Sequence, residues 1–135
     1  MSESNADILR GVYDAFNRRD VAAAFARLSP EIQVDYHGVL IDARGSYRGH
    51  EGVSELTRMI LDSFDVEAFT VEVEDITEQG DRVAVALHQW SSGASSGVPV
   101  DVRNGHVWTL RDGKAIRWEI YKDRTEAWEA LGPSR

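Results

Sequence analysis

The hydrophobic pattern of the chain changes period near Phe64. Before this residue, apolar side chains recur at spacings of three and four, as in Val53, Leu56 and Ile60. After it, runs rich in Val, Ile, Thr and Trp are separated by turn sequences. The first pattern is typical of amphipathic helices and the second of strands. Because strands joined by short turns pair antiparallel and helices must bury their apolar face, the sequence predicts an α+β fold.

Turn and capping residues place the expected elements. Asp112-Gly113 and 79–81 separate strand-like runs, and Asp-Gly in such a place is typical of a two-residue hairpin. Asp20 can cap a second helix, and Gly132-Pro133 ends the last one. We expect helices at 5–28, in two consecutive segments, at 50–64 and at 123–131. We expect strands at 32–37, 69–77, 82–90, 98–110 and 115–121.

Three local features stay open at this stage. Residues 39–41 resemble a short strand, but the glycines within 38–49 indicate a loop or a loose hairpin. Asn104-Gly105 is a strong turn sequence inside an expected long strand, so it forms either a hairpin or a bulge, and we favour the bulge. The first strand turns either Tyr36 or its neighbours Asp35 and His37 toward the helices, and we favour Tyr36.

Length and charge exclude several classes of protein. The 135 residues correspond to one ordinary domain, placed at 1–135 with its core at about 5–132. The absence of cysteine excludes disulfides, thiolate metal sites and a cysteine nucleophile. The net charge of -8 repels phosphate backbones and anionic lipid, so we expect neither nucleic acid nor a membrane as a partner. Apolar runs are too short to span a membrane and no signal core opens the chain, so a cytoplasmic location is the default expectation.

Several stretches of the chain resemble a known family. Residues 15–20 end the first helix, 47–53 open the third, and 106–114 lead into Arg117-Trp118. Together with 126–132, these stretches resemble the SnoaL-like branch of the nuclear-transport-factor-2-like superfamily, which includes polyketide cyclase and ketosteroid isomerase-like proteins. The resemblance covers about residues 7–132. It implies a cone-shaped α+β barrel, in which helices pack on one face of a curved, mainly antiparallel sheet around an apolar cavity.

Two residues of this expected cavity are candidates for catalysis. His106 aligns about where steroid isomerases of the superfamily keep a buried acid, and a histidine there can donate a hydrogen bond or transfer a proton. Tyr36 can offer its hydroxyl to a ligand, although both residues also suit plain core packing. The same alternation turns Ile116 inward and Ala115 outward. The expected ligand-binding walls are Val12, Phe16, Leu56, Ile60, Asn104, Trp108, Trp118 and Ile120.

One departure from the family counts against a cyclase or epoxide-hydrolase mechanism. Proteins of those types that resemble this chain carry an acid on the last strand, where Ile120 stands here. Glu119 is one step away and so faces outward, where we expect it to pair with Arg117 or Arg103. The four histidines are scattered, and neither a phosphate-binding loop nor a nucleophile elbow occurs. We therefore expect no metal and no cofactor.

The function that we expect is a SnoaL-like small-molecule pocket that takes an apolar or ring-containing ligand. If the protein is an enzyme, His106 and Tyr36 carry isomerase- or cyclase-type acid–base chemistry on an apolar carbonyl compound. The alternatives are a non-catalytic binding or accessory module with the same cavity, and a protein-interaction domain that uses the outer sheet face. The sequence decides neither the ligand nor whether the chain is catalytic. We also expect a homodimer through an outer face that bears Ala84, Ala86, Arg103, Val107, Arg117 and Tyr121.

Overall fold

Four helices and six strands make up the described part of the chain. The computed structural model describes residues 3–37, 44–62, 69–92 and 99–133, except the side chains of Arg44, Ile60, Leu61, Ser92 and Val100. The elements follow in the order α1 (Asn5–Asn17), α2 (Val21–Ala26), β1 (Leu28–His37), β2 (Arg44–Arg48), α3 (Gly49–Asp62), β3 (Thr70–Gln79), β4 (Arg82–Ser92), β5 (Pro99–Arg111), β6 (Lys114–Tyr121) and α4 (Arg124–Leu131). None of the described helices meets the length and hydropathy that crossing a membrane requires.

Side chains at the helix N-termini satisfy backbone N–H groups that the helices themselves leave free. The Ser4 hydroxyl accepts from the Asp7 N–H, and the carboxylates of Asp20 and Asp123 accept from the N–H groups three residues later. The predicted helix starts are therefore confirmed. The second helix is shorter than expected, because it ends at Ala26 and Leu28 already begins β1 with its side chain in the core.

The six strands form one sheet in the order β2-β1-β6-β5-β4-β3. All neighbours pair antiparallel except β1 and β6, which are parallel. Parallel neighbours require a long crossover, and here the segment from β2 to β5 supplies it. Residues 44–48 are the outer arm of a hairpin with β1, which settles part of the open question about 38–49. Residues 38–43 lie outside the described part of the chain.

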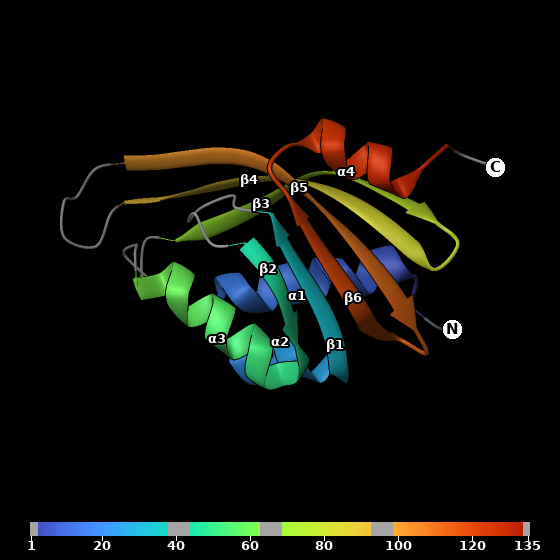
Figure 1. The fold of residues 1–135 in the computed structure, drawn as a ribbon, viewed down its shortest axis with the longest axis horizontal. Coiled ribbons are helices and arrows are strands. Elements are labelled where there is room, and N and C mark those ends of the chain that lie inside the picture. The colour runs from blue at the N-terminus through green and yellow to red at the C-terminus, as the bar shows by residue number, and fades with distance from the viewer. Residues whose placement is uncertain (1–2, 38–43, 63–68, 93–98, 134–135) are drawn as a thin grey trace.

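The two faces of the curved sheet are covered by different helices, as Figure 1 shows. α1, α2 and α3 lie on the inner face, as the sequence predicts for the helices that precede the strands, and the main core forms there. Ile32, Val34 and Tyr36 of β1 all point into this core. The predicted register of the first strand is therefore confirmed, and Asp35 lies on the outer face. The mixed α+β fold with a curved, unclosed sheet matches the predicted class.

α4 packs on the outer face, across β4 and β5. Ala84 and Val107 from the sheet and Ala127 and Leu131 from the helix form a second, smaller core. A Cβ added to Gly105 would lie 2.6 Å from the Ala127 Cβ, so this glycine allows the helix to approach the sheet. The expectation that Ala84 and Val107 belong to a dimer interface is wrong, because α4 of the same chain already buries both.

Asn104-Gly105 forms neither a turn nor a bulge. β5 runs through both residues and pairs with β4 in unbroken register from Arg82 to Ser92. The bulge lies nearer the hairpin, between the pairs Thr109–Arg117 and Leu110–Ala115. It reverses the expected alternation at this point, since Ala115 is in the inner core and Ile116 is not.

The close contact under α4 gives a test of the packing. We expect Gly105→Ala to lower the free energy of unfolding by about 1–3 kcal/mol, because the new methyl group overlaps the Ala127 side chain and crowds the Asp123 carbonyl. Gly11→Ala in α1 is the matched control, since its Cβ meets nothing within 4 Å. It should leave stability unchanged or raise it by about 0.5–1 kcal/mol. Urea unfolding of the two variants checks both outcomes, and equal stabilities would contradict the packing of α4 described here.

Candidate functional site

A chain of three buried aromatic residues joins α1 to the inner face of the sheet. The indole N–H of Trp108 donates to the Tyr13 hydroxyl over 2.8 Å. The Tyr13 hydroxyl in turn lies 2.6 Å from Nδ1 of His106. All three side chains are almost fully removed from solvent. Because buried polar groups are costly when unpaired, this chain fixes the position of each ring.

The hydrogen-bond pattern favours one tautomer of His106. An indole nitrogen can only donate, so the Tyr13 oxygen accepts from Trp108, and the Tyr13 proton is satisfied when His106 accepts it. Nδ1 of His106 is then an acceptor, and the proton of the neutral ring is on Nε2. Within the described residues, no protein group bonds to this Nε2–H. The imidazole therefore offers one hydrogen-bond donor on the inner face.

Burial keeps this imidazole neutral. Desolvation lowers the pKa of His106 from 6.5 to about 3, since the charged form loses its hydration. The pKa of Tyr13 is raised, mainly by burial and against a smaller opposing effect of the Trp108 hydrogen bond. At neutral pH both groups are uncharged. His106 is accordingly a weak base, and its protonated form is too costly for it to act as a general acid.

Trp118 of β6 adds a second donor beside His106. Its ring stacks on Trp108 with centroids 4.6 Å apart, and its centroid lies 5.4 Å from that of His106. The Trp118 Nε1 atom is buried and makes no hydrogen bond to any described residue. Two N–H donors thus lie on neighbouring rings of the inner face.

Asn104 is two residues before His106 on β5 and shares its face. Its side-chain oxygen accepts a hydrogen bond of 2.6 Å from the amide of Gln89 on β4. Its amide nitrogen is buried and, like the Trp118 nitrogen, has no partner in the part of the chain that the structure describes. An unpaired buried donor costs about 1–3 kcal/mol, so each such group favours an acceptor brought by a ligand.

The other site residues predicted from sequence, apart from Ile60, lie on the inner side, where strand alternation or helical spacing places them. Val12, Leu56, Tyr36 and Ile120 are buried in the inner core. Phe16 is partly buried and makes an edge-to-face contact with Phe69 at 5.8 Å. The side chain of Ile60 lies outside the described part of the chain.

Sequence reasoning missed Tyr13 and Gln89. Tyr13 lies in the apolar stripe of the first helix, and a buried tyrosine needs a partner for its hydroxyl. That need was the available signal, but the partner is 93 residues away in sequence. Gln89 lies on the inner face of a strand at 7% exposure, where a glutamine is buried only if it is hydrogen-bonded.

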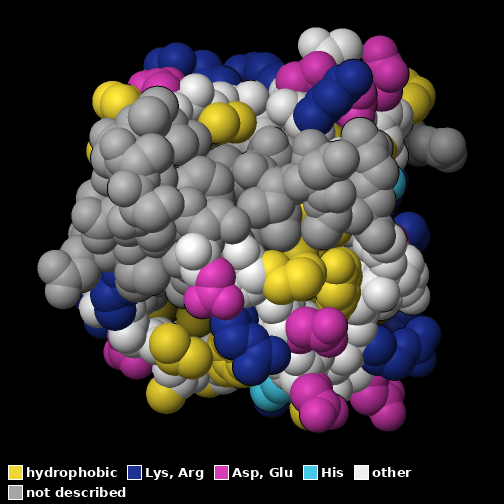
Figure 2. Space-filling view, turned by 60° about the vertical axis from the view of Figure 1, so that its left-hand side comes forward, with side chains coloured by type: hydrophobic (Ala, Val, Ile, Leu, Met, Phe, Trp, Pro, Cys, Tyr) yellow, Lys and Arg dark blue, Asp and Glu magenta, His cyan; other side chains and the backbone are white. Residues whose placement is uncertain are grey.

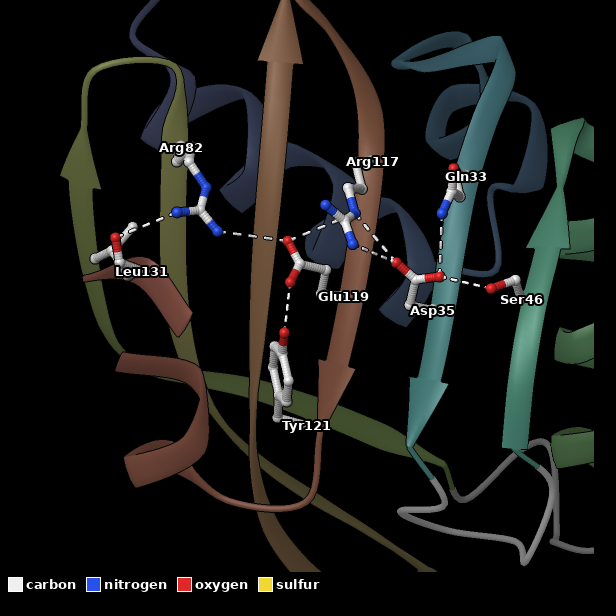
Figure 3. Close-up of polar contacts among 8 residues, drawn as sticks. All are labelled: Gln33, Asp35, Ser46, Arg82, Arg117, Glu119, Tyr121 and Leu131. Carbon is white, nitrogen blue, oxygen red and sulfur yellow. Dashed lines mark hydrogen bonds and ion pairs between the residues drawn. The ribbon is translucent and has the colours of Figure 1, made fainter. Parts of the chain in front are cut away.

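The outer face carries a polar and charged network that includes residues of β1, β2, β4 and β6 and the end of α4 (Figure 3). Arg117 donates to one oxygen of Asp35 over 2.8 and 3.1 Å. The buried carboxylate of Glu119 lies 3.5 Å from Arg82 and 3.7 Å from Arg117, and it accepts from the Tyr121 hydroxyl. Arg82 also donates to the Leu131 carbonyl at the end of α4. The expected pairing of Glu119 with Arg117 is confirmed and that with Arg103 is wrong, because Arg103 pairs with Glu74 instead.

Ionisation in this network is set by its internal contacts. Burial tends to raise the pKa of Asp35, but hydrogen bonds from Arg117, Ser46 and Gln33 bring the pKa below its ordinary value. The same hydrogen bond raises the pKa of Arg117. Burial and then the bond to Glu119 raise the pKa of Tyr121. Each carboxylate has a cation beside it, so the network holds the sheet and α4 together rather than presenting a free acid or base.

Three side chains of the outer face come close enough to share a metal ion. Glu72, Glu74 and His88 place their ligand atoms within 4.8 Å of one another, because Glu72 and His88 are opposite each other on β3 and β4. The sequence predicted no such grouping. Arg103 already pairs with Glu74, and Asp101 bonds to His88 over 2.8 Å. Glu74 and His88 therefore each already have a protein partner.

Figure 2 shows one side of the surface, on which acidic and basic side chains are mixed. Small groups of hydrophobic side chains lie between them. This side therefore carries both signs of charge. Although the chain has more acidic than basic residues, the acidic side chains seen here do not form one continuous patch.

Solved structures share this arrangement of helices under a curved sheet. One is a nuclear-transport-factor-2-like protein of unknown function from Burkholderia pseudomallei, with 22% identity, coverage of 98% of this chain and 100% of that one, and a TM-score of 0.79. TerC, co-crystallised with polyporic acid, is 26% identical over 94% of this chain and 96% of that one, with a TM-score of 0.75. A ketosteroid isomerase-like protein from Catenulispora acidiphila, in complex with trimethylamine, is 12% identical over 92% and 91%, with a TM-score of 0.74.

The fold is thus that of the nuclear-transport-factor-2-like proteins, as the sequence predicted. The family model of the SnoaL-like domain matches residues 9–118. The chain belongs to the SnoaL-like domain family. No curated protein matches the sequence significantly.

The buried imidazole predicts a specific pH dependence of stability. The unfolded chain binds a proton at His106 below pH 6.5, whereas the folded chain does so only near pH 3. Stability is therefore lost as the pH falls through this window, by about 1.4 kcal/mol per pH unit at most. In His106→Asn, the Oδ1 atom can replace Nδ1 as the acceptor for Tyr13, but the side chain does not titrate.

We expect the free energies of unfolding of the wild type and His106→Asn to converge as the pH falls from 7 to 4. Any deficit of the variant at pH 7 should shrink or reverse, because only the wild type bears the cost of keeping His106 neutral. Urea unfolding at each half pH unit measures the difference. A difference that stays constant over this range would contradict the burial and neutrality of His106.

Proposed function

We propose that the protein binds a small apolar carbonyl compound against the inner face of the sheet. His106 donates its Nε2–H to the carbonyl oxygen, and Trp118 is placed to add a second N–H. The observation that supports this most directly is the Tyr13–His106–Trp108 chain, which occupies Nδ1 and leaves Nε2–H as the free donor. Two N–H donors to one oxygen would also stabilise a developing oxyanion.

Binding and polarisation of the carbonyl are better supported than proton transfer. A pKa of about 3 makes His106 a weak base, and the carboxylates of Asp35 and Glu119 face the opposite side of the sheet. Tyr36 is buried on the inner face, where it suits a binding role. The leading function is therefore a SnoaL-like pocket that orients a carbonyl ligand, with catalysis limited to steps that a neutral donor can assist.

The relatives support a small-molecule role without naming the ligand. TerC was co-crystallised with polyporic acid, and its sequence is 26% identical to this chain. Polyporic acid is accordingly one probe for binding. A second is 2-acetylnaphthalene, which combines one carbonyl with a flat apolar ring of the kind that stacks on tryptophan.

Titration calorimetry with these two probes tests the proposal. We expect His106→Asn to weaken binding about tenfold or more, because it keeps the acceptor for Tyr13 but loses the donor at Nε2, a change worth about 1–3 kcal/mol. His106→Gln, whose amide can reach the Nε2 position, should retain more of the affinity. Tyr121→Phe on the outer face is the control and should bind as the wild type does.

Two results would refute this function. One is the absence of binding of either probe by the folded wild type at millimolar concentration. The other is equal affinity of the wild type and His106→Asn, since the ligand would then not contact the imidazole.

We further propose that the chain forms a homodimer through the part of the outer face that α4 leaves uncovered. Arg103 and Arg117 lie there with more than a third of their area exposed, and Tyr121 is partly exposed. Light scattering at high micromolar concentration should give twice the chain mass of 15.1 kDa. A monomer at that concentration would exclude the dimer, whatever the protein binds on its inner face.

A further inference from the structure

We infer that Asn104 is a specificity-determining residue, which selects a ligand with a second hydrogen-bond acceptor at the end remote from the carbonyl held by His106. This inference rests on the proposed function. The proposed function names one group of the ligand, a carbonyl, and this inference names the class of ligand that carries it. The selected class is a flat apolar molecule with acceptor oxygens at both ends. A ligand that ends in an amine or another donor is disfavoured.

The buried amide nitrogen of Asn104 is the first observation behind this inference. Asn104 is 1% exposed, and its Nδ2 atom has no hydrogen-bond partner among the described residues. An amide nitrogen has two protons to donate and cannot accept. A ligand acceptor placed there recovers the cost of the unpaired group, whereas a ligand donor adds a second unpaired group to it.

Gln89 determines which end of the Asn104 amide is presented. Gln89 is opposite Val102 in the β4–β5 register and so diagonal to Asn104, a separation that a glutamine side chain can bridge. Its Nε2–H donates to the Asn104 oxygen over 2.6 Å. Because that oxygen is occupied, the nitrogen is left to face a ligand. Gln89 is thus a positioning residue that acts through Asn104.

The spacing of the two donors sets the length of the ligand. Asn104 and His106 are separated by two residues of one strand, and two residues of a strand span about 7 Å. Both side chains project from the same face. This spacing fixes where the two side chains begin on the strand rather than where their donor atoms lie, so it indicates a ligand about as long as two fused rings. A naphthalene with oxygen-bearing groups on ring carbons 2 and 6 is a probe of that length.

Two probes that differ only at one end test this selection. 2,6-Diacetylnaphthalene has an acceptor at each end, and 6-amino-2-acetylnaphthalene replaces one of these with a donor. By titration calorimetry, we expect the wild type to prefer the diacetyl compound about tenfold, the ratio that corresponds to about 1.4 kcal/mol. Asn104→Leu should bring the ratio near one, because a leucine of similar size neither donates nor accepts.

Gln89→Glu gives a sharper readout than loss of affinity. A glutamate has no proton for the Asn104 oxygen and instead accepts from its amide nitrogen, so the amide turns over and presents its oxygen. We expect the preference to reverse in favour of the amino compound. A purely structural role of Gln89 would not reverse a ratio. Arg103→Gln, which changes the residue beside Asn104 on the outer face, is the control and should keep the wild-type ratio.

The outcomes separate the two proposals. If the diacetyl and amino compounds bind equally to the wild type, or if Asn104→Leu and Gln89→Glu both keep the wild-type ratio, Asn104 does not select the ligand. In that case His106→Asn still weakens both compounds if the proposed function holds. If neither compound binds the folded wild type, both the function and this inference are refuted. Should Gln89→Glu fail to fold, Asn104→Leu decides the question alone.

Discussion

The hydroxyl of Tyr13 is the group on which the inner face of this protein depends. Its oxygen accepts from Trp108, and its proton is satisfied when His106 accepts it. A residue of α1 therefore fixes the tautomer of a residue of β5. Removing Tyr13 leaves the Trp108 N–H and Nδ1 of His106 without this partner, and each unpaired buried group costs about 1–3 kcal/mol. The position of α1 against the sheet consequently also determines which hydrogen-bond donor His106 presents.

The described inner face carries no free carboxylate. In this it differs from the cyclases and epoxide hydrolases that the sequence resembles, in which an acid on the last strand is expected. Asp35 and Glu119, on the strands β1 and β6, face the other side of the sheet, and each is paired with an arginine. What the described inner face offers is a set of N–H donors on neutral side chains. Neutral donors bind an oxygen without the desolvation cost of a charge, so they suit ligands that are themselves uncharged and mostly apolar.

The elements of the fold were predictable where local sequence decides them. Alternation placed Tyr36, His106 and Trp118 on the inner face, and capping residues placed the helix starts. Predictions failed where a distant partner decides. The Asn104-Gly105 sequence favours a turn locally, but it continues a strand because Asn104 bonds to Gln89 and α4 requires a glycine beneath it. The sequence predicted which residues lie on the inner face. It did not predict the hydrogen bonds between them, because the partner of His106 comes from another element.

The parallel pairing of β1 with β6 has a consequence for how the chain reaches this structure. Tyr36 on β1 has Ile120 as its partner on β6, so the two strands meet only after the chain has been synthesised as far as β6. Until then, β1 has β2 as a neighbour on one side only, and its backbone groups on the β6 side must be hydrated. Contacts of such long sequence separation slow folding and leave strand edges open to other chains. The N-terminal half is therefore the part of the nascent chain most exposed to misassociation on the ribosome.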